Sequence, residues 1–163
     1  SMLDHPNIIN VFAFYSNDKS YSYITEFCQE GDLYEQLMNK GGYDENKTAY
    51  IMYQIFSAVN YCHKNKIINR ELTLENILVS EIKDDLPTVK VGYFGTSILA
   101  DNNVIKLRSK PDSYYIPPEA NRSSDNYSDK SDIWLCGIIM YFLIAARPPF
   151  IGKDEEEKRA NFY

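Results

Sequence analysis

Apolar residues alternate with polar ones near the start of the chain. Residues 9–14 and 21–27 are alternating runs rich in aromatic and β-branched side chains, and a polar turn at 17–19 separates them. Strands with this period, joined by a short turn, predict an antiparallel hairpin.

Helical spacing of apolar residues begins after this hairpin. A short helix is expected from Asp32, with Glu35 completing a capping box, to the glycines at 41–42. Residues 44–66 and 128–146 carry apolar side chains at three- and four-residue spacing, which predicts two longer helices.

Short strands and one long loop lie between the two longer helices. Residues 67–68, 77–79 and 89–91 are short β-branched or apolar runs that predict strands. Residues 93–116 show neither the helical nor the strand spacing of apolar residues. A loop of that length inside a compact chain is usually functional. A last helix can begin at 154–159. The pattern predicts an α+β fold that is mainly α-helical.

Composition excludes several classes of function. The chain has 163 residues, a net charge of −6 and no basic tract, so we expect no nucleic-acid binding. The most apolar stretch, residues 133–146, is too short to span a membrane. Three widely spaced cysteines predict a reduced, cytoplasmic protein. We interpret residues 1–2 as a cloning remnant.

Four motifs occur in a fixed order along the chain. Residues 69–76 read N-R-E-L-T-L-E-N, 93–95 read Y-F-G, 117–119 read P-P-E and 132–137 read D-I-W-L-C-G. They resemble the H-R-D-L-x-x-x-N, D-F-G, A-P-E and D-x-W-x-x-G motifs of eukaryotic protein kinases. The segments at 3–8 and 114–116 are similar to those of calcium/calmodulin-dependent and calcium-dependent Ser/Thr kinases.

The resemblance implies a domain organisation. Residues 3–31 correspond to the last strands of the small lobe and the hinge, and 32–163 to the helical C-terminal lobe. The expectation is a partial protein kinase domain, residues 3–163, truncated at both ends, with ATP and Mg²⁺ as the cofactors of the family.

The catalytic positions depart from the family pattern. Glu71 stands where kinases have the Asp that accepts the substrate hydroxyl proton, and its carboxylate is one methylene further from the backbone. Thr73 replaces a frequent Lys, whereas Asn76, the second-metal ligand, is kept. Tyr93 replaces the Asp that holds Mg²⁺, and a neutral phenol is a poor Mg²⁺ ligand. We therefore expect impaired Mg²⁺ binding and no normal phosphate transfer. The alternative for Tyr93 is that it fills the vacated cleft as core packing.

Positions that bind the nucleotide in the family are also present. Thr25 resembles the gatekeeper, Glu26 and Cys28 the hinge, Asp32 the ribose-binding acid, and Leu78 the floor of the adenine pocket. A purely structural role remains open for each, and for Asp32 this is helix capping.

Several further positions carry expectations from the resemblance. Asn69 replaces a spine His next to Phe94, and Asp112 adds negative charge near Glu71. Glu75 matches a residue that binds basic side chains of the substrate in the family. Arg70 can pair with an acidic or phosphorylated activation segment; the possible acceptors are Thr96, Ser97, Ser109 and Ser113.

Other side chains of the motifs are expected to support the architecture. Asp132 would anchor the catalytic-loop backbone, Trp134 would fill core beneath the activation segment, and Glu119 would be exposed or re-paired. We expect surface or packing roles for His5 and His63.

Three functions remain open from the sequence. The first is an inactive kinase-like scaffold or regulator that binds partner proteins, and the second is an active ATP-dependent Ser/Thr kinase in a longer chain. The third is a module that binds nucleotide without catalysis. The isolated chain should fail every kinase assay and should self-associate through an open cleft face.

Overall fold

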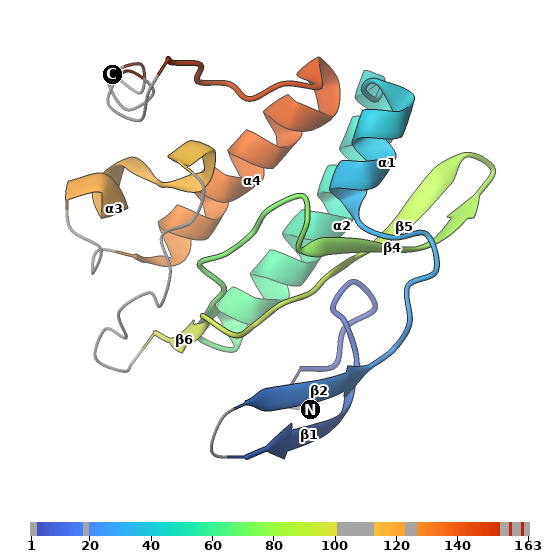
Figure 1. Ribbon diagram of the computed structural model, residues 1–163, viewed down its shortest axis with the longest axis vertical. Coiled ribbons are helices and arrows are strands. Elements are labelled where there is room, and N and C mark those ends of the chain that lie inside the picture. The colour runs from blue at the N-terminus through green and yellow to red at the C-terminus, as the bar shows by residue number, and fades with distance from the viewer. Residues whose placement is uncertain are drawn as a thin grey trace.

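The computed structural model describes residues 3–17, 20–100, 113–122 and 127–153, together with Glu157 and Asn161. Three two-stranded sheets and four α-helices are arranged along this part of the chain (Figure 1). The strands are β1 (Val11–Ser16), β2 (Tyr21–Thr25), β3 (Ile67–Ile68), β4 (Ile77–Lys83), β5 (Leu86–Val91) and β6 (Ile98–Leu99). The helices are α1 (Leu33–Lys40), α2 (Glu45–Lys64), α3 (Pro118–Arg122) and α4 (Asp129–Ala145), with a 3₁₀ turn, η1, at Ser113–Tyr115.

The predicted first hairpin is confirmed. β1 and β2 pair antiparallel, with Phe14 opposite Tyr23 and a register shift between Val11 and Ala13. Every residue of β2 is exposed, because no further strand or helix covers this sheet in the described part of the chain. The segment before β1 ties the hairpin to β5, since Ile8 forms a parallel bridge with Val91.

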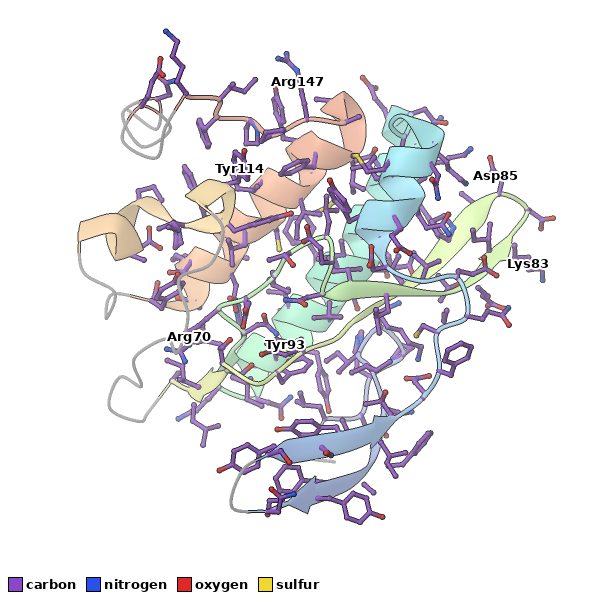
Figure 2. The ribbon with its side chains drawn as sticks, viewed as in Figure 1. Arg70, Lys83, Asp85, Tyr93, Tyr114 and Arg147 are labelled. Carbon is purple, nitrogen blue, oxygen red and sulfur yellow. The ribbon has the colours of Figure 1, made fainter. Side chains whose placement is uncertain are left out.

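A second antiparallel hairpin, β4–β5, forms the centre of the molecule. Its turn residues Asp84 and Asp85 both have positive φ, 52° and 64°, as type I′ turns require. Asp85 accepts hydrogen bonds from Lys40 on α1 and Lys47 on α2, so the turn is held against both helices. Figure 2 shows Asp85 at the tip of this hairpin, remote from Tyr93 at its other end.

The three predicted helices form with the expected caps. Asp32 accepts a hydrogen bond from the amide of Glu35, and Asp44 accepts one from that of Lys47, both at 2.8 Å. Ser128 and Ser131 form a capping box at the start of α4. Helix α2 ends two residues before the predicted end, because Lys66 has a φ of 59° and leaves the helical region.

The core lies between α2, α4 and the β4–β5 hairpin (Figure 1). Gln54 of α2 joins the helix to β5, since its Oε1 accepts from the Val89 amide and its Nε2 donates to the Pro87 carbonyl. Burial raises the pKa of the Cys62 and Cys136 thiols to about 12, so both are inert core residues. The fully buried core side chains include Leu33, Leu37, Ile51, Ile55, Leu72, Leu74, Ile77, Leu135, Ile139 and Leu143.

The prediction that residues 93–116 lack regular structure is wrong in two places. β6 pairs with β3, with Ile67 opposite Leu99, and η1 forms a 3₁₀ turn. A two-residue strand has no readable period, and its partner lies far away in sequence. Helix α3 was also not predicted, although Pro118 occupies its first position, which proline favours. The expected helix at 154–159 lies outside the described residues, apart from Glu157.

No helix in the described part of the chain combines the length and the apolar character that a membrane span requires.

Candidate active site

The loop between β3 and β4 is anchored by one buried carboxylate. Asp132 of α4 is fully buried and accepts hydrogen bonds from the amides of Asn69 (2.9 Å) and Arg70 (2.8 Å). His63 of α2 places Nε2 2.8 Å from the same carboxylate. The predicted anchoring role of Asp132 is confirmed, and His63 has the packing role that was one of its two expected roles.

The three predicted catalytic residues lie together in this loop. The Asn76 side-chain amide donates to the Glu71 carbonyl at 2.9 Å, and the Asn76 backbone amide donates to Thr73 Oγ1 at 3.3 Å. The Glu71 carboxylate accepts a hydrogen bond from Thr96 Oγ1 at 2.8 Å. The loop therefore brings a carboxylate, an amide and a hydroxyl together, with Glu71 already bound to a residue from the segment after β5.

Tyr93 follows the end of β5 and does not pack in the core. Its side chain is 55% exposed and its φ is 51°, a left-handed conformation that is uncommon for a bulky residue. Among the described residues Tyr93 is therefore not part of the core, and its ring lies against Gly95. The alternative that Tyr93 fills the vacated cleft stays a prediction. The Gly92 amide donates to the Asn76 carbonyl at 2.8 Å, which joins the Tyr93 segment to the catalytic loop.

The residues of the predicted hinge leave β2 and run toward α1. Thr25 ends β2 and is exposed, so no described side chain encloses it. The Glu26 carboxylate accepts from the amide of Asn10 (2.7 Å) and from Lys90 Nζ (3.0 Å). Cys28 is half-buried, and burial, followed by the charge of Glu26, raises the pKa of its thiol.

Two more predicted nucleotide-site residues are neighbours. Asp32 and Leu78 form an antiparallel bridge, and Val79 donates to the carbonyl of Gly31 at 2.9 Å. The hinge is thereby fixed on β4. Asp32 is the N-cap of α1, so its structural role is present irrespective of any ribose contact.

Arg70 holds the segment that follows Tyr93. Its guanidinium is buried, its Nε donates to the Thr96 carbonyl at 2.6 Å, and Nη2 donates to the same oxygen. Burial lowers the pKa of Arg70, while the nearby Tyr127, Asp132 and Glu71 act to raise it. The Tyr127 ring lies 6.0 Å from the guanidinium carbon, and burial raises the pKa of its hydroxyl to about 12.

Two of the proposed phosphate acceptors form hydrogen bonds with the loop between β3 and β4. Thr96 bonds Glu71, and Ser97 Oγ donates to the Asn69 carbonyl at 3.4 Å. Ser109 and Asp112 lie outside the described residues, as does the side chain of Ser113. Glu75 is exposed on the loop between β3 and β4, as a residue that binds basic substrate side chains would have to be.

Asn69 occupies an apolar position in the interior. It is 2% exposed, and its side-chain oxygen accepts from the Glu71 amide at 3.0 Å. Its Nδ2 has no hydrogen-bond partner among the described residues. Burying an unpaired amide N–H costs free energy, whereas the amide oxygen is satisfied, so the expected weakening of the position stays a prediction.

The donor set is poorly suited to Mg²⁺. Asn76 offers one amide oxygen, Glu71 is bound by Thr96, and the residue in the metal position is a tyrosine. No cluster of three or more His, Cys, Asp or Glu side chains capable of holding a metal occurs in the described ranges. Because Mg²⁺ prefers carboxylates and phosphate oxygens, these residues do not fit the ion on their own.

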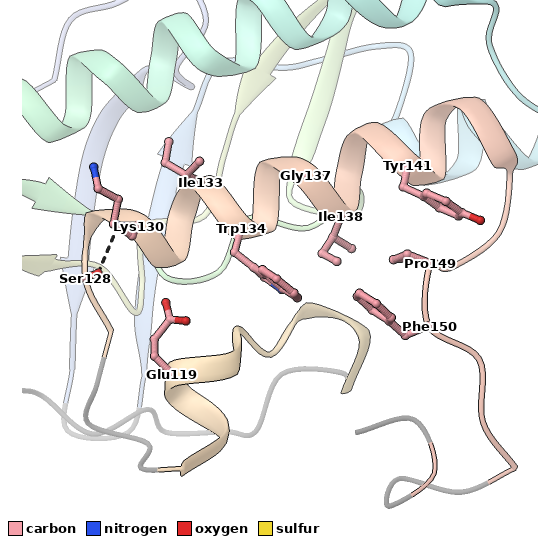
Figure 3. A pocket seen from close by; sticks show the side chains of 10 residues that line it. All are labelled: Glu119, Ser128, Lys130, Ile133, Trp134, Gly137, Ile138, Tyr141, Pro149 and Phe150. Atoms are coloured by element: carbon pink, nitrogen blue, oxygen red, sulfur yellow. Dashed lines mark hydrogen bonds between the residues drawn. The ribbon is translucent and has the colours of Figure 1, made fainter. Parts of the chain in front are cut away.

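A hollow of about 760 Å³ lies beside α4, away from the catalytic loop. Trp134 stacks on Phe150 with ring centroids 5.9 Å apart, and Figure 3 shows both on the wall of this hollow with Glu119 at one end. Glu119 accepts a hydrogen bond from Ser131 Oγ at 2.6 Å, so it is re-paired as one of the two expectations had it. Trp134 is half-buried and contributes to the core only in part.

Two residues contribute to the site in a way that the sequence does not predict. Thr96 was considered as a phosphate acceptor but not as the partner of Glu71, although its place directly after the Y-F-G motif puts it near the catalytic loop. Lys90 alternates with the buried Val89 and Val91, which indicates that it faces away from the core toward Glu26. His5 binds Ser57 and not the site, in agreement with its expected packing role.

Comparisons with known proteins all match this chain to protein kinases. The family model for the protein kinase domain matches residues 1–163. Calcium-dependent protein kinase 5 of Plasmodium berghei (strain Anka) is 37% identical over 156 residues, which are 95% of this chain and 27% of that protein. Calcium-dependent protein kinase 4 of Plasmodium falciparum (isolate 3D7) is 33% identical over 94% of the chain and 29% of that protein.

A relative from another group of organisms is similar to a comparable extent. A probable myosin light chain kinase of Dictyostelium discoideum is 32% identical over 96% of the chain and 32% of that protein. The chain thus spans about a third or less of the length of the curated relatives it matches.

Proposed function

Because the chain belongs to the protein kinase domain family, we propose that it forms part of a Ser/Thr kinase-like domain that does not transfer phosphate normally. In this proposal the protein works as a scaffold or regulator that binds partner proteins. The kinase family and the calcium-dependent relatives support the kinase-like half of the proposal. The residue at the metal position supports the inactive half.

The observation that carries the proposal is Tyr93. A kinase requires a carboxylate there to hold Mg²⁺ against the nucleotide phosphates, and the ion supplies the main electrostatic stabilisation of the transition state. Tyr93 is an exposed phenol, and no group of three or more His, Cys, Asp or Glu side chains able to hold a metal occurs among the described residues. Glu71, at the position of the base, has its carboxylate bound by Thr96.

The experiment measures thermal unfolding of the whole natural protein that carries this chain, with ATP and with or without Mg²⁺. We expect the wild type to show no Mg²⁺-dependent rise in Tm. Tyr93→Asp should gain one, because a ligand at about 100 times its Kd stabilises a protein by about 2.7 kcal/mol. Tyr93→Phe, which keeps the ring and lacks the hydroxyl, is the matched control and should behave as the wild type.

Transfer of radiolabelled phosphate to a peptide is the outcome that would contradict the proposal. If the wild type phosphorylates a basic peptide and Glu71→Ala abolishes that transfer, the protein is an active Ser/Thr kinase. In that case the charge that Tyr93 lacks is supplied by another group.

A second candidate is nucleotide binding without catalysis, in which the cleft holds ATP in the absence of a metal. It is favoured by the fixed hinge, where Lys90 and Asn10 both bind Glu26 and where Asp32 bridges to Leu78. A rise in Tm with ATP that is equal with and without Mg²⁺ would distinguish this function from a scaffold that binds no nucleotide.

The same proposal covers partners and location. We place the protein inside the cell, which its three free cysteines support. We also propose that the isolated chain self-associates, since large aromatic side chains on the hairpin and the hinge are exposed.

A further inference from the structure

The carboxylate at the base position is occupied from within the chain. Thr96 Oγ1 lies 2.8 Å from Glu71 Oε2 and 3.5 Å from the Asn69 carbonyl, so its single proton is best placed on the carboxylate. In the described part of the chain, Glu71 makes no other side-chain hydrogen bond. Before phosphate transfer, the hydroxyl of a substrate donates a hydrogen bond to the catalytic base. The Thr96 hydroxyl makes the same kind of bond to Glu71.

The Thr96 hydroxyl is held in place by its backbone. The buried Arg70 binds the Thr96 carbonyl through Nε (2.6 Å) and Nη2, and Ser97 Oγ donates to the Asn69 carbonyl (3.4 Å). Asp132 fixes the amides of both Asn69 and Arg70 from α4. The contact therefore joins two segments whose backbones are both anchored, and Thr96 is only half-exposed.

The length of the side chain at position 71 makes the contact possible. A glutamate carries its carboxylate one methylene further from the backbone than the aspartate of the family, which moves the oxygens by more than about 1 Å. Hydrogen bonds weaken steeply over such a distance. An aspartate on the same backbone is therefore expected to make a longer and weaker contact with Thr96.

We propose that Thr96 is an internal pseudo-acceptor, whose hydroxyl occupies the Glu71 carboxylate and excludes the hydroxyl of an incoming peptide. The proposal deepens the proposed function and rests on it for the assignment of Glu71 to the base position. It assigns to Thr96 an autoinhibitory contact that is separate from the loss of the metal carboxylate at Tyr93.

The first test measures occupancy of the carboxylate in this chain. Carbodiimide coupling of an amine to Glu71 is followed by mass spectrometry, with the exposed Glu75 of the same loop as internal reference. Thr96→Val removes the hydroxyl at nearly constant shape and should raise the labelling rate of Glu71 relative to Glu75 by about tenfold, the effect of one hydrogen bond to a charged group. Thr96→Ser keeps the hydroxyl and should label as the wild type. Equal rates in the wild type and Thr96→Val would overturn the proposal.

The second test measures exclusion of a substrate hydroxyl in the whole natural protein. A basic peptide containing one serine is compared with its alanine twin by calorimetry, without nucleotide or Mg²⁺. The wild type should not distinguish the two peptides, whereas Thr96→Val should bind the serine peptide about tenfold more tightly. A serine preference in the wild type, or none in Thr96→Val, contradicts the proposal.

The two tests separate this inference from the proposed function. Neither includes ATP or a metal, so their failure leaves the inactivity argument from Tyr93 unchanged. Phosphate transfer by the wild type would instead contradict the proposed function, whatever the labelling rates are.

Discussion

At the scale of single residues, three left-handed backbone conformations lie close to the candidate site. Of the six described non-glycine residues with positive φ, Lys66 (59°), Arg70 (69°) and Tyr93 (51°) lie on segments that meet the loop between β3 and β4. Such conformations cost about 1 kcal/mol or more each and persist where surrounding contacts over-determine them. For Arg70 these contacts are Asp132 and the Thr96 carbonyl.

His5 gives a prediction for the pH dependence of stability. Its Nδ1 accepts from the Asn7 amide at 3.1 Å and its Nε2 lies 3.0 Å from Ser57 Oγ, so the folded protein binds the neutral ring. Burial lowers the pKa of His5 from 6.5, with Asp4 opposing this shift and Lys90 adding to it. His5 therefore binds a proton more readily in the unfolded chain than in the folded chain. The free energy of unfolding should fall as the pH drops through 6.5.

Urea unfolding of wild type and His5→Gln between about pH 8 and pH 5 tests this prediction. The variant should be less stable at high pH, because it loses the Asn7 contact, and should lose less stability on acidification. All other ionisable groups are the same in the two proteins, so the difference between their curves isolates the contribution of His5. Parallel curves would show that His5 makes no contribution to the pH dependence.

At the scale of elements, one side chain of α4 fixes the loop between β3 and β4. Asp132 accepts two backbone hydrogen bonds and lies next to His63, which joins α2, α4 and the catalytic loop at a single carboxylate. Asp132→Ala should therefore lower the free energy of unfolding by about 3 kcal/mol, because two buried amides and a histidine lose their acceptor. The matched control is Asp129→Ala in the same helical turn, where the half-exposed carboxylate contacts Lys130, and should cost about 0.5 kcal/mol.

Denaturant unfolding measures both variants, and amide hydrogen exchange shows where the loss occurs. The amides of Asn69 and Arg70 should exchange faster in Asp132→Ala and remain unchanged in Asp129→Ala. An unfolding free energy of Asp132→Ala equal to that of the control would mean that water replaces the carboxylate without cost.

The helices and their caps could be predicted from the sequence because the signals are local. Asp32, Asp44 and Ser128 are polar residues directly before helical spacing begins, and each caps a helix as expected. β6 could not be predicted in this way, because two residues become a strand only through pairing with β3. The order of the motifs placed Glu71, Asn76 and Tyr93 near one another, whereas the bond from Thr96 to Glu71 depends on side-chain geometry that no spacing encodes.

At the scale of the whole molecule, apolar surface is distributed unevenly. The interior between α2, α4 and β4–β5 is closed, but the β1–β2 hairpin is a sheet of two strands with both faces open in the described part of the chain. Phe14 stacks on Tyr21 at 5.9 Å and packs near Tyr23 at 5.2 Å, so these aromatic side chains of the hairpin cover one another. Isolated two-stranded sheets are at best marginally stable in water.

The exposed aromatic surface predicts self-association of the chain. Phe12 is 69% exposed on β1 and Phe27 is 87% exposed on the hinge. Light scattering of the isolated chain should therefore give a mass above that of the monomer, rising with concentration, because association removes this area from water. The double variant Phe12→Ser/Phe27→Ser should shift the mass toward the monomer.

Tyr53→Ser is the matched control for this experiment. Tyr53 is 75% exposed on α2, outside the hairpin and the hinge, and its loss should leave the mass distribution unchanged. A monodisperse monomer in the wild type would contradict the prediction, and an equal effect of Tyr53→Ser would show that general hydrophobicity and not the hairpin drives association.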